Sequence, residues 1–573
     1  MTAFKHLFIN IILFLTATLS FAQGIGKKML IDPYNYTIQK DVEGKNGIVA
    51  CAHPLAAKVG MDILLQGGNA IDAVIATQLV LAVVYPDAGN LGGGGFMIAT
   101  LGDKKIALDF REMAPGTANR DMYLDKKTGK ANITLSQEGY LSSGVPGTVA
   151  GLFAAMKYAK LPFEVLIQPA IELAGKGFVI TEGEANSLNS AVNDFKRNNK
   201  ILPVFVKPNG LWKAGDTLVQ KELALTLKRI KDKRRSGFYE GETAKLLVSE
   251  MKKNGGIISA SDLKNYKVKY RVPAEFDYKG YHIITMSLPG SGGILLQQML
   301  KMLEGRPLAQ YGFNTAKSVQ LVTEVERRTY ADRAEYLGDP DFNKVPVNTL
   351  VSDTYLRQRM SDYDSTRAGI SANVKPGFIK ESDQTTHISI IDKDGNCVSV
   401  TTTLNGLYGN KCVVTGAGFL LNNEMDDFSI QPGVPNLYGA IGGKANAIAP
   451  RKRMLSSMSP TIVLKDGKPF MVVGTPGGTT IITSVLQSII DVIDYGMNAH
   501  DAVNKPKFHH QWLPDQVDVE KEFPAEVRKQ LQIMGYKINE RKPWSRTELI
   551  MFKNDVLYEA AADTRGDDDA EGY

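Results

Sequence analysis

The sequence predicts an α+β protein in which helices and antiparallel strands form separate layers. Helical patterns occupy much of the first two thirds of the chain, as over residues 318–337. After residue 385 the pattern changes to runs of β-branched residues joined by Asp-Gly turns, which is typical of hairpins. This mixture favours α+β layers over a parallel, doubly wound sheet.

Length and composition indicate a globular protein with a large core. Of the 573 residues, 43% are hydrophobic and 22% are charged, which excludes a disordered or fibrous chain. No long Pro-, Gly- or Ser-rich linker separates compositionally different blocks, so a single intertwined unit is as consistent with the length as several domains. The net charge of +6 is spread along the chain, and the basic run at residues 228–235 lacks interleaved aromatic residues. We therefore expect no nucleic-acid binding.

The first 22 residues have the pattern of a signal peptide. Lys5 precedes an apolar run from Leu7 to about Leu19, and small residues lead to Ala22. A membrane anchor is the alternative, but the run is shorter than the roughly 20 residues that a spanning helix needs. We expect cleavage after Ala22 and a secreted, periplasmic mature protein with no membrane span.

The next segments predict a strand, two helices and a glycine loop. Residues 47–52 form the strand, residues 54–66 form a helix that ends at Gly67 and Gly68, and a second helix begins near Asn69. The glycines at 92–95 are not followed by the Gly-Lys-Ser/Thr of a phosphate-binding loop, so we expect them to allow close packing.

A predicted hairpin brings two threonines together. Its β-rich runs flank a three-residue loop, Lys393 to Gly395, with glycine at the left-handed position. Pairing about Asp394 places Thr403 opposite Thr385, with Cβ atoms about 4.5–5.5 Å apart. A register slip of one residue would send the two hydroxyls to opposite faces. We expect the same type of turn at residues 466–467.

Eight motifs resemble those of the γ-glutamyltranspeptidases in order and spacing. They are GNLGGGGFM, DFREMAP, DQTTHISIIDKDGNCVSVTTTLN, LLNNEMDDFS, PGVPNLYG, RMLSSMSPT, GTPGG and FHHQWLPD. The resemblance extends from about Gly47 to the C-terminus. It implies an Ntn-hydrolase fold, a four-layer αββα sandwich of two antiparallel sheets flanked by helices. It also implies a precursor cut between Gln384 and Thr385 into a large subunit, residues 23–384, and a small subunit, residues 385–573, that form one intertwined unit.

The cut would supply the base that a threonine nucleophile needs. A freed α-amino group has a pKa of about 7.7–8.0, so part of it is neutral at physiological pH and can take the hydroxyl proton. The resemblance makes Thr385 the nucleophile and Thr403 its hydrogen-bond partner. The alternative is that these threonines are simply strand formers.

The remaining site residues follow from the resemblance and from the charges of the substrate. A γ-glutamyl group carries an α-carboxylate and an α-ammonium, so its pocket needs a cation and an anion. The resemblance assigns Arg111 to the carboxylate, which a planar guanidinium can bind with two parallel hydrogen bonds, and Asp427 to the ammonium. Taken singly, the two could be a surface ion-pair partner and part of a solvated acidic turn. The other polar contacts are assigned to Asn405, Glu424, Ser456 and Ser457; Glu424, which is glutamine in some members, makes this pocket more acidic.

Two further segments complete the expected site. Gly477 and Gly478 precede a helical run, where backbone N–H groups can form an oxyanion hole, although an ordinary turn is the alternative. Residues 431–443 correspond to the family's lid, with Tyr438 as its gating aromatic. Thr564 replaces a proline of the family, which leaves the geometry of the C-terminal tail open.

No metal or organic cofactor is expected. His509 and His510 are adjacent and point in different directions, and we expect His387 to be packed or hydrogen-bonded rather than to act as a base. The three cysteines, Cys51, Cys397 and Cys412, are too few for a disulfide framework and are expected to be buried.

The predicted function is a γ-glutamyltransferase and glutathione hydrolase. Its substrates would be glutathione and related γ-glutamyl amides, with water, an amino acid or a peptide as acceptor. The alternatives are a cephalosporin or glutaryl acylase of the same fold and an inactive exported binding protein. The lid favours γ-glutamyl compounds over bulky acyl groups.

Overall fold

Two seven-stranded antiparallel sheets form the centre of the fold in the computed structural model, which describes residues 31–374, 385–431, 443–554 and 556–573. In spatial order the first sheet consists of β19 Asp569–Gly572, β2 Gly47–Cys51, β10 Thr386–Asp392, β11 Cys397–Thr403, β3 Gly94–Leu101, β4 Lys104–Asp109 and β7 Lys269–Arg271. The second consists of β1 Asp41–Gly44, β18 Leu557–Ala562, β17 Glu548–Asn554, β13 Lys468–Gly474, β12 Thr461–Lys465, β9 Tyr281–Thr285 and β8 Ala274–Tyr278. Residues Pro33–Tyr573 are one contact unit, so the two sheets belong to one body.

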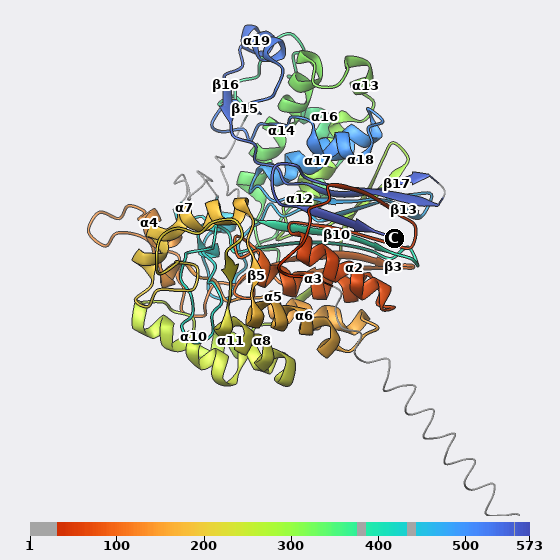
Figure 1. The fold of residues 1–573 in the computed structure, drawn as a ribbon. Coiled ribbons are helices and arrows are strands. Elements are labelled where there is room, and N and C mark those ends of the chain that lie inside the picture. The colour runs from red at the N-terminus through yellow and green to blue at the C-terminus, as the bar shows by residue number, and fades with distance from the viewer. Residues whose placement is uncertain (1–30, 375–384, 432–442, 555) are drawn as a thin grey trace, which may run out of the picture. The chain divides into compact units, whose positions relative to one another are not determined.

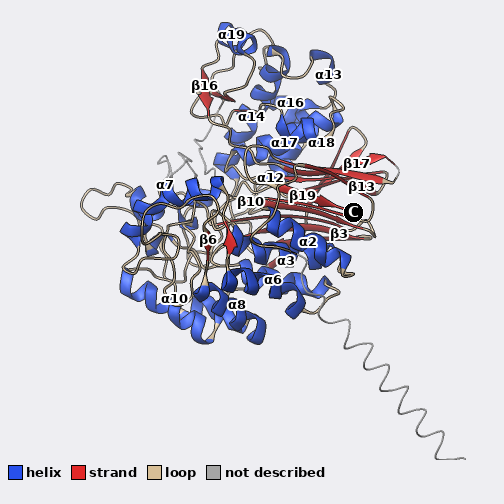
Figure 2. Cartoon of the chain, in the orientation of Figure 1, coloured by secondary structure: helices blue, strands red, loops and turns tan. Residues whose placement is uncertain are grey.

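Helices cover the outer face of each sheet (Figure 1, Figure 2). On the first sheet lie α2 Pro54–Leu65, α3 Ala70–Val84 and α5 Thr148–Ala155, with α6 Phe163–Lys176 and α8 Lys221–Lys233 beyond them. On the second lie α12 Gly292–Leu303, α17 Thr480–Ile493 and α18 Ala499–Asn504, with α14 Ala316–Tyr336 against α12. Strands β10 and β11 face β13 and β17 across the interior. The predicted αββα sandwich is therefore confirmed.

The other elements lie outside these four layers. The longer helices are α7 Glu182–Asn198, α10 Gly241–Asn254, α11 Ala260–Asn265, α16 Asp353–Arg359 and α19 Ala525–Ile533, and the short ones are α4 Ile133–Gln137, α9 Ser236–Tyr239, α13 Leu308–Tyr311 and α15 Val347–Leu350. A small sheet contains β14 Phe508–His509, β15 Val517–Glu520 and β16 Ile538–Arg541, and β5 Phe178–Val179 pairs with β6 Thr217–Leu218.

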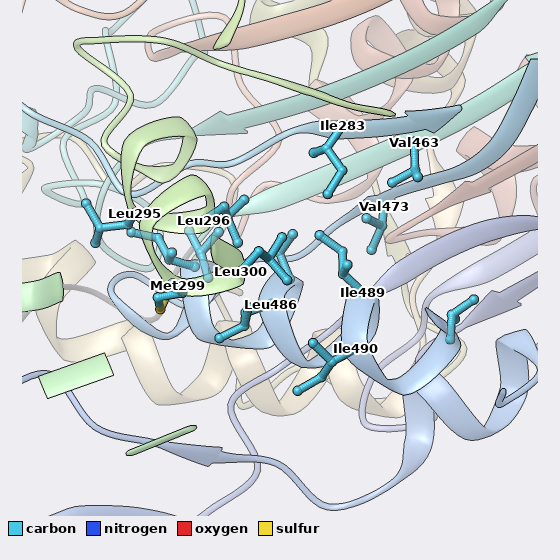
Figure 3. Packing of buried hydrophobic residues seen from close by; sticks show 14 of the residues in the cluster. Ile283, Leu295, Leu296, Met299, Leu300, Val463, Val473, Leu486, Ile489 and Ile490 are labelled. Atoms are coloured by element: carbon cyan, nitrogen blue, oxygen red, sulfur yellow. The ribbon is translucent and has the colours of Figure 1, made fainter. Parts of the chain in front are cut away.

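Aliphatic side chains join the second sheet to its helices (Figure 3). Residues from α12 and α17 meet residues from β9, β12 and β13, and all are at most 3% exposed: Leu295, Leu296, Met299, Leu300, Leu486, Ile489, Ile490, Ile283, Val463 and Val473. Burial of each such side chain contributes about 1.5–3 kcal/mol to folding. This packing holds α17 against the second sheet. The Gly477–Gly478 loop leads directly into α17, so the packing also positions the loop.

The first predicted hairpin has the predicted register. Strands β10 and β11 pair from Thr386 with Thr402 to Ile391 with Cys397, and the last loop residue, Gly395, has a left-handed φ of 75°. The second hairpin differs from the prediction. Lys465 pairs with Lys468, which leaves only two loop residues, Asp466 at φ 50° and Gly467 at φ 75°. Both φ angles are positive because a two-residue turn must match the strand twist.

The predicted helix ends and cysteine environments are confirmed. The Asn69 side chain accepts hydrogen bonds from the N–H groups of Ile71 and Asp72 and begins α3, while Gly67 beyond α2 has a φ of 92°. All three cysteines are buried and unpaired.

The glycine loop allows two backbones to approach each other, as predicted. A Cβ atom on Gly93 would lie 2.0 Å from the Thr403 carbonyl oxygen, and one on Gly95 would lie 2.3 Å from that of Thr401. The glycines thus let β3 begin directly beside the end of β11, where Thr403 lies.

We expect Gly93→Ala to destabilise the protein by about 1–3 kcal/mol or more, because the clash is with backbone that cannot move alone. Gly175→Ala is the matched control, since its Cβ would meet only Ala224 at 3.7 Å. Thermal melts of the two variants test this, and equal midpoints would contradict it.

Candidate active site

Thr385 lies at the start of β10, directly before the first residue of the strand, and is 5% exposed. The register of β10 and β11 places Thr403 opposite it, one step beyond the pair Thr386 and Thr402. The Thr403 hydroxyl oxygen accepts a hydrogen bond from the Asn405 N–H at 2.8 Å. Asn405 has a left-handed φ of 72°, a conformation that asparagine tolerates better than most residues. The chain therefore turns sharply at the end of β11, beside the two threonines.

His387 is buried one pair further along the same face. Its Nδ1 lies 2.8 Å from the Thr401 hydroxyl and its Nε2 lies 3.1 Å from that of Ser389. Burial lowers the pKa of His387 to about 3, so the ring is neutral at physiological pH. The prediction of a hydrogen-bonded histidine is confirmed.

One small cavity collects most of the predicted site residues. It is lined by Arg111, Thr385, Thr403, Asn405, Glu424, Asp427, Ser456, Ser457, Met458, Gly478 and Ile481. These come from the start of β10, from the ends of β4 and β11, from the start of α17 and from loops, so the cavity lies where several elements begin or end. A hydroxyl, a guanidinium and carboxylates thus share one concave space, the usual form of a small-molecule site.

Arg111 is fully buried beyond the end of β4. Its guanidinium bonds to Glu424 Oε1 and, at 2.5 Å, to Asp427 Oδ2, and it donates to the Leu455 carbonyl oxygen at 3.3 Å. The Tyr266 hydroxyl donates to the Arg111 carbonyl oxygen at 2.8 Å and holds the backbone. Arg111 is therefore not a surface ion-pair partner, and Asp427, with a side chain 8% exposed, is not in a solvated turn.

More carboxylates than cations surround Arg111. Glu112, Glu424 and Asp427 all lie within ion-pair distance of its guanidinium. Burial raises the pKa of Glu424 to about 8 and that of Glu112 to about 7, and Arg111 opposes the rise in both. The cavity therefore holds excess negative charge at high pH and can accept a cationic group.

The serine pair lies beside Arg111 and is held by buried residues. The Ser456 carbonyl oxygen accepts hydrogen bonds from the N–H and the hydroxyl of Ser291, each at 2.7 Å. Arg333, on α14, donates to the Ser457 hydroxyl oxygen at 3.0 Å and to that of Ser291 at 2.8 Å. Because a guanidinium only donates, it holds the Ser457 oxygen as an acceptor.

Gly477 and Gly478 lie between β13 and α17, with left-handed φ angles of 132° and 61°. The Gly477 carbonyl oxygen accepts hydrogen bonds from the N–H and the hydroxyl of Thr480, at 3.2 and 2.6 Å, which fixes the loop to the helix start. Gly478 lines the cavity, and Gly477 is its neighbour. A helix N-terminus of this kind presents N–H groups to negative charge.

Comparisons with known proteins identify the family of this chain. The family model for gamma-glutamyltranspeptidase matches residues 56–573. The chain belongs to the γ-glutamyltranspeptidase family. It is 46% identical over 546 residues to the glutathione hydrolase proenzyme of Escherichia coli (strain K12), with 94% of each chain covered.

Solved structures confirm the Ntn-hydrolase fold of this γ-glutamyltranspeptidase-family chain. The cephalosporin acylase from Bacillus halodurans superposes with a TM-score of 0.83 at 26% identity, covering 96% of this chain and 99% of that chain. The Helicobacter pylori gamma-glutamyltranspeptidase structure has a TM-score of 0.56 at 42% identity and covers 60% of this chain and 96% of that one.

The candidate site has contacts that the sequence did not predict, and one predicted residue cannot be placed. Tyr438 lies outside the described residues. Sequence reasoning missed Arg333, Met458 and Ile481. The only feature that could have indicated Arg333 was its charge, because it lies in a helix whose residues are largely buried. In the tail, the Thr564 N–H and hydroxyl donate to the Asn504 side-chain oxygen at 3.0 and 2.7 Å, and β19 still joins the first sheet.

We expect Glu424→Gln to raise the stability of the folded protein mainly at high pH. The folded-state pKa of about 8 exceeds the ordinary value of about 4.3, so Glu424 contributes stability that is fully present below pH 4.3 and is lost as the pH rises from there through 8. The melting temperature of the variant should exceed that of the wild type by much more at pH 9 than at pH 5. Glu522→Gln, at an exposed glutamate, is the control. An equal shift at both pH values would contradict the prediction.

Proposed function

We propose that this chain is a γ-glutamyltransferase and glutathione hydrolase that cuts itself between Gln384 and Thr385. It would transfer the γ-glutamyl group of glutathione and related amides to water, an amino acid or a peptide. The observation that carries the proposal is the single cavity in which Thr385 lies with Arg111 and Asp427. The family and the relative named glutathione hydrolase proenzyme support the same activity. Gln384 lies outside the described residues.

Thr385 would act as nucleophile once its α-amino group is free. The neutral amine takes the hydroxyl proton, the hydroxyl oxygen attacks the γ-carbonyl carbon, and the proton passes to the leaving amine. A γ-glutamyl ester on Thr385 remains. Water or an acceptor amine then attacks this ester, and the threonine oxygen recovers a proton as it leaves. Thr403, opposite Thr385 in the sheet, would orient the hydroxyl.

The two charges of the γ-glutamyl group fit the charges of the cavity. Its α-carboxylate would lie on Arg111 and the hydroxyls of Ser456 and Ser457, and its α-ammonium on Asp427 and Glu424, with Asn405 nearby. Arg111 already forms an ion pair with Asp427, so a bound zwitterion that places its carboxylate on Arg111 and its ammonium on Asp427 keeps both buried charges paired. This compensation favours a substrate that carries both charges.

Negative charge develops on the carbonyl oxygen during attack. The N–H groups of Gly477 and Gly478 at the start of α17 would stabilise it, and one such donor is typically worth about 2.7–4 kcal/mol of barrier. Their left-handed backbone explains why glycine occupies both positions.

A cephalosporin or glutaryl acylase is the second candidate, because the superposition with the Bacillus halodurans acylase is extensive. A glutaryl group has no ammonium, however, and would leave Asp427 and Glu424 facing an uncharged methylene chain. The charge of the cavity therefore favours γ-glutamyl substrates over glutaryl ones.

We also infer that the protein is exported and works in the periplasm. The signal-peptide pattern of residues 1–22 supports this inference. Across the described segments, no helix combines the length and apolar character that crossing a membrane requires.

N-terminal sequencing of the smaller fragment of purified protein tests the proposal. A fragment beginning Thr-Thr-His-Ile-Ser, with release of p-nitroaniline from a γ-glutamyl anilide, supports it. Faster turnover of a glutaryl anilide would favour the acylase. An uncut, inactive wild-type chain would leave only a binding protein.

A further inference from the structure

The loop that carries the proposed oxyanion donors has little conformational preference of its own. Gly477 and Gly478 have φ angles of 132° and 61°, in a region that glycine enters without steric cost. The direction of their N–H groups therefore depends on the residues that hold each side of the loop. On the helix side this residue is Thr479, which directly follows Gly478 and lies at the N-terminal end of α17.

Thr479 is held by residues outside its own helix. A threonine at the start of a helix usually has an extended backbone and caps the first turn through its side chain. Thr479 instead has a φ of −60° and a ψ of −31°, and its side chain forms no capping hydrogen bond to α17, all of which the structure describes. Its hydroxyl donates to the Gln511 side-chain oxygen at 2.7 Å, and its carbonyl oxygen accepts a hydrogen bond from the Tyr330 hydroxyl at 2.5 Å. These two contacts determine where α17 begins.

Tyr330, Thr479, Gln511 and His509 form one cluster, and each is at most 5% exposed. His509 Nε2 lies 2.8 Å from the Gln511 side-chain oxygen, and its Nδ1 lies 2.8 Å from the Thr483 hydroxyl on α17. The Tyr330 ring packs edge-on against His509, with centroids 5.7 Å apart. Burial lowers the pKa of His509 to about 4, so the ring is neutral at physiological pH and donates through Nε2 to the Gln511 oxygen. The Gln511 oxygen thus accepts from both His509 and Thr479.

The cluster connects α14 to the FHHQWLPD segment, which no step of the proposed reaction uses. Glu326, Tyr330 and Arg333 have the i, i+4, i+7 spacing of one face of α14. Glu326 accepts a hydrogen bond from the His510 N–H at 2.9 Å, Tyr330 holds the start of α17, and Arg333 holds Ser457. One buried helix face therefore holds both the loop that faces the reacting carbonyl and a serine of the proposed carboxylate site.

We propose that Tyr330 and Gln511 are positioning residues for acyl transfer, which act through Thr479 to direct the N–H groups of Gly477 and Gly478 at the oxyanion. The inference rests on the proposed function. The oxyanion exists only in the tetrahedral intermediates, so correct positioning stabilises the transition state more than the bound substrate. Formation and breakdown of the ester on the threonine both pass through such an intermediate, so both half-reactions depend on these contacts.

Tyr330→Phe, which removes only the hydroxyl that holds Thr479, tests the inference. We expect kcat for γ-glutamyl-4-nitroanilide to fall about tenfold and KM to change less than twofold, because a displaced oxyanion donor lowers the rate and not substrate binding. Rates are expressed per mole of cut chain, measured on a denaturing gel. Tyr363→Phe is the matched control, since the Tyr363 hydroxyl donates to Gln320 on the same helix at 2.7 Å. The two variants should have similar melting temperatures, and Tyr363→Phe should keep the wild-type kcat.

Variants of Thr479 give an independent test that does not alter α14. Thr479→Val has nearly the same shape as the wild type but lacks the hydroxyl that donates to Gln511. We expect the same fall in kcat with little change in KM. Thr479→Ser keeps the hydroxyl and should restore most of the lost rate.

Two inhibitors separate positioning from a general loosening of the site. In a boronic acid analogue of the γ-glutamyl group, the Thr385 oxygen adds to boron and its proton passes to the α-amino group, which leaves a tetrahedral anion with an oxygen at the oxyanion position. The inhibition constant of this compound should rise about tenfold in Tyr330→Phe and Thr479→Val, whereas that of glutamate should change less than twofold.

Unchanged kinetics in Tyr330→Phe and Thr479→Val, a rise in KM alone, or equal losses of affinity for the two inhibitors would overturn the inference. An equally large fall in kcat in Tyr363→Phe would overturn it as well. If the wild type released no p-nitroaniline from the anilide, the proposed function itself would be wrong, so the two failures are distinguishable.

Discussion

Thr385→Ala is expected to remain a single uncut chain and to lose hydrolysis of γ-glutamyl anilides by at least about 10⁴-fold, as removal of a nucleophile does in other hydrolases. The loss has two causes in one side chain. The hydroxyl is the proposed attacking group for the self-cleavage, and it is the proposed attacking group for the substrate. Because Thr385 lies just before the first residue of β10, a central strand whose register does not depend on the threonine hydroxyl, the fold should persist.

Thr385→Ser is the matched control for this prediction. Serine keeps the hydroxyl, so this variant should still be cut and should keep measurable activity. A denaturing gel and an anilide assay on both variants give the result. Fragments from Thr385→Ala, or anilide turnover by it, would show that another group attacks.

The hairpin at the nucleophile could be predicted from the sequence because its geometry is local. The loop at Lys393 to Gly395 determines the register, and the register places Thr403 opposite Thr385. The second turn was predicted less well, since an Asp-Gly pair suits both two-residue and three-residue loops. Only the pairing of Lys465 with Lys468 decides between them.

The charged part of the site could not be predicted from residue patterns alone. The site combines residues that are far apart in the sequence or lie on different elements, such as Arg111, Glu424 and Ser457. Only the resemblance to a family linked them. Arg333 was missed because most residues of α14 are buried, charged residues included. The spacing of hydrophobic residues along the helix therefore does not indicate which residue donates to Ser457.

The second large effect is expected at Arg111. Arg111→Met should lower kcat/KM for γ-glutamyl-4-nitroanilide by about 10²–10⁴-fold, because it removes the proposed partner of the α-carboxylate and a bidentate pair cannot re-form. The loss should depend on the substrate. A 4-aminobutyryl anilide has the ammonium but no α-carboxylate, so the wild type should prefer the γ-glutamyl anilide strongly and the variant should not.

Misfolding is the competing explanation for such a loss, since Arg111→Met leaves Glu112, Glu424 and Asp427 buried without their cation. The double variant Arg111→Met with Glu424→Gln separates the two effects. At pH 9, above the Glu424 pKa of about 8, Glu424→Gln removes the cost of keeping this carboxyl buried, so the melting temperature at that pH should recover in part while activity on the γ-glutamyl anilide does not. Recovery of activity together with stability would mean that Arg111 holds the cavity in shape and does not bind the substrate. Arg111→Lys, which keeps the charge but not the planar fork, should fall between wild type and Arg111→Met in activity.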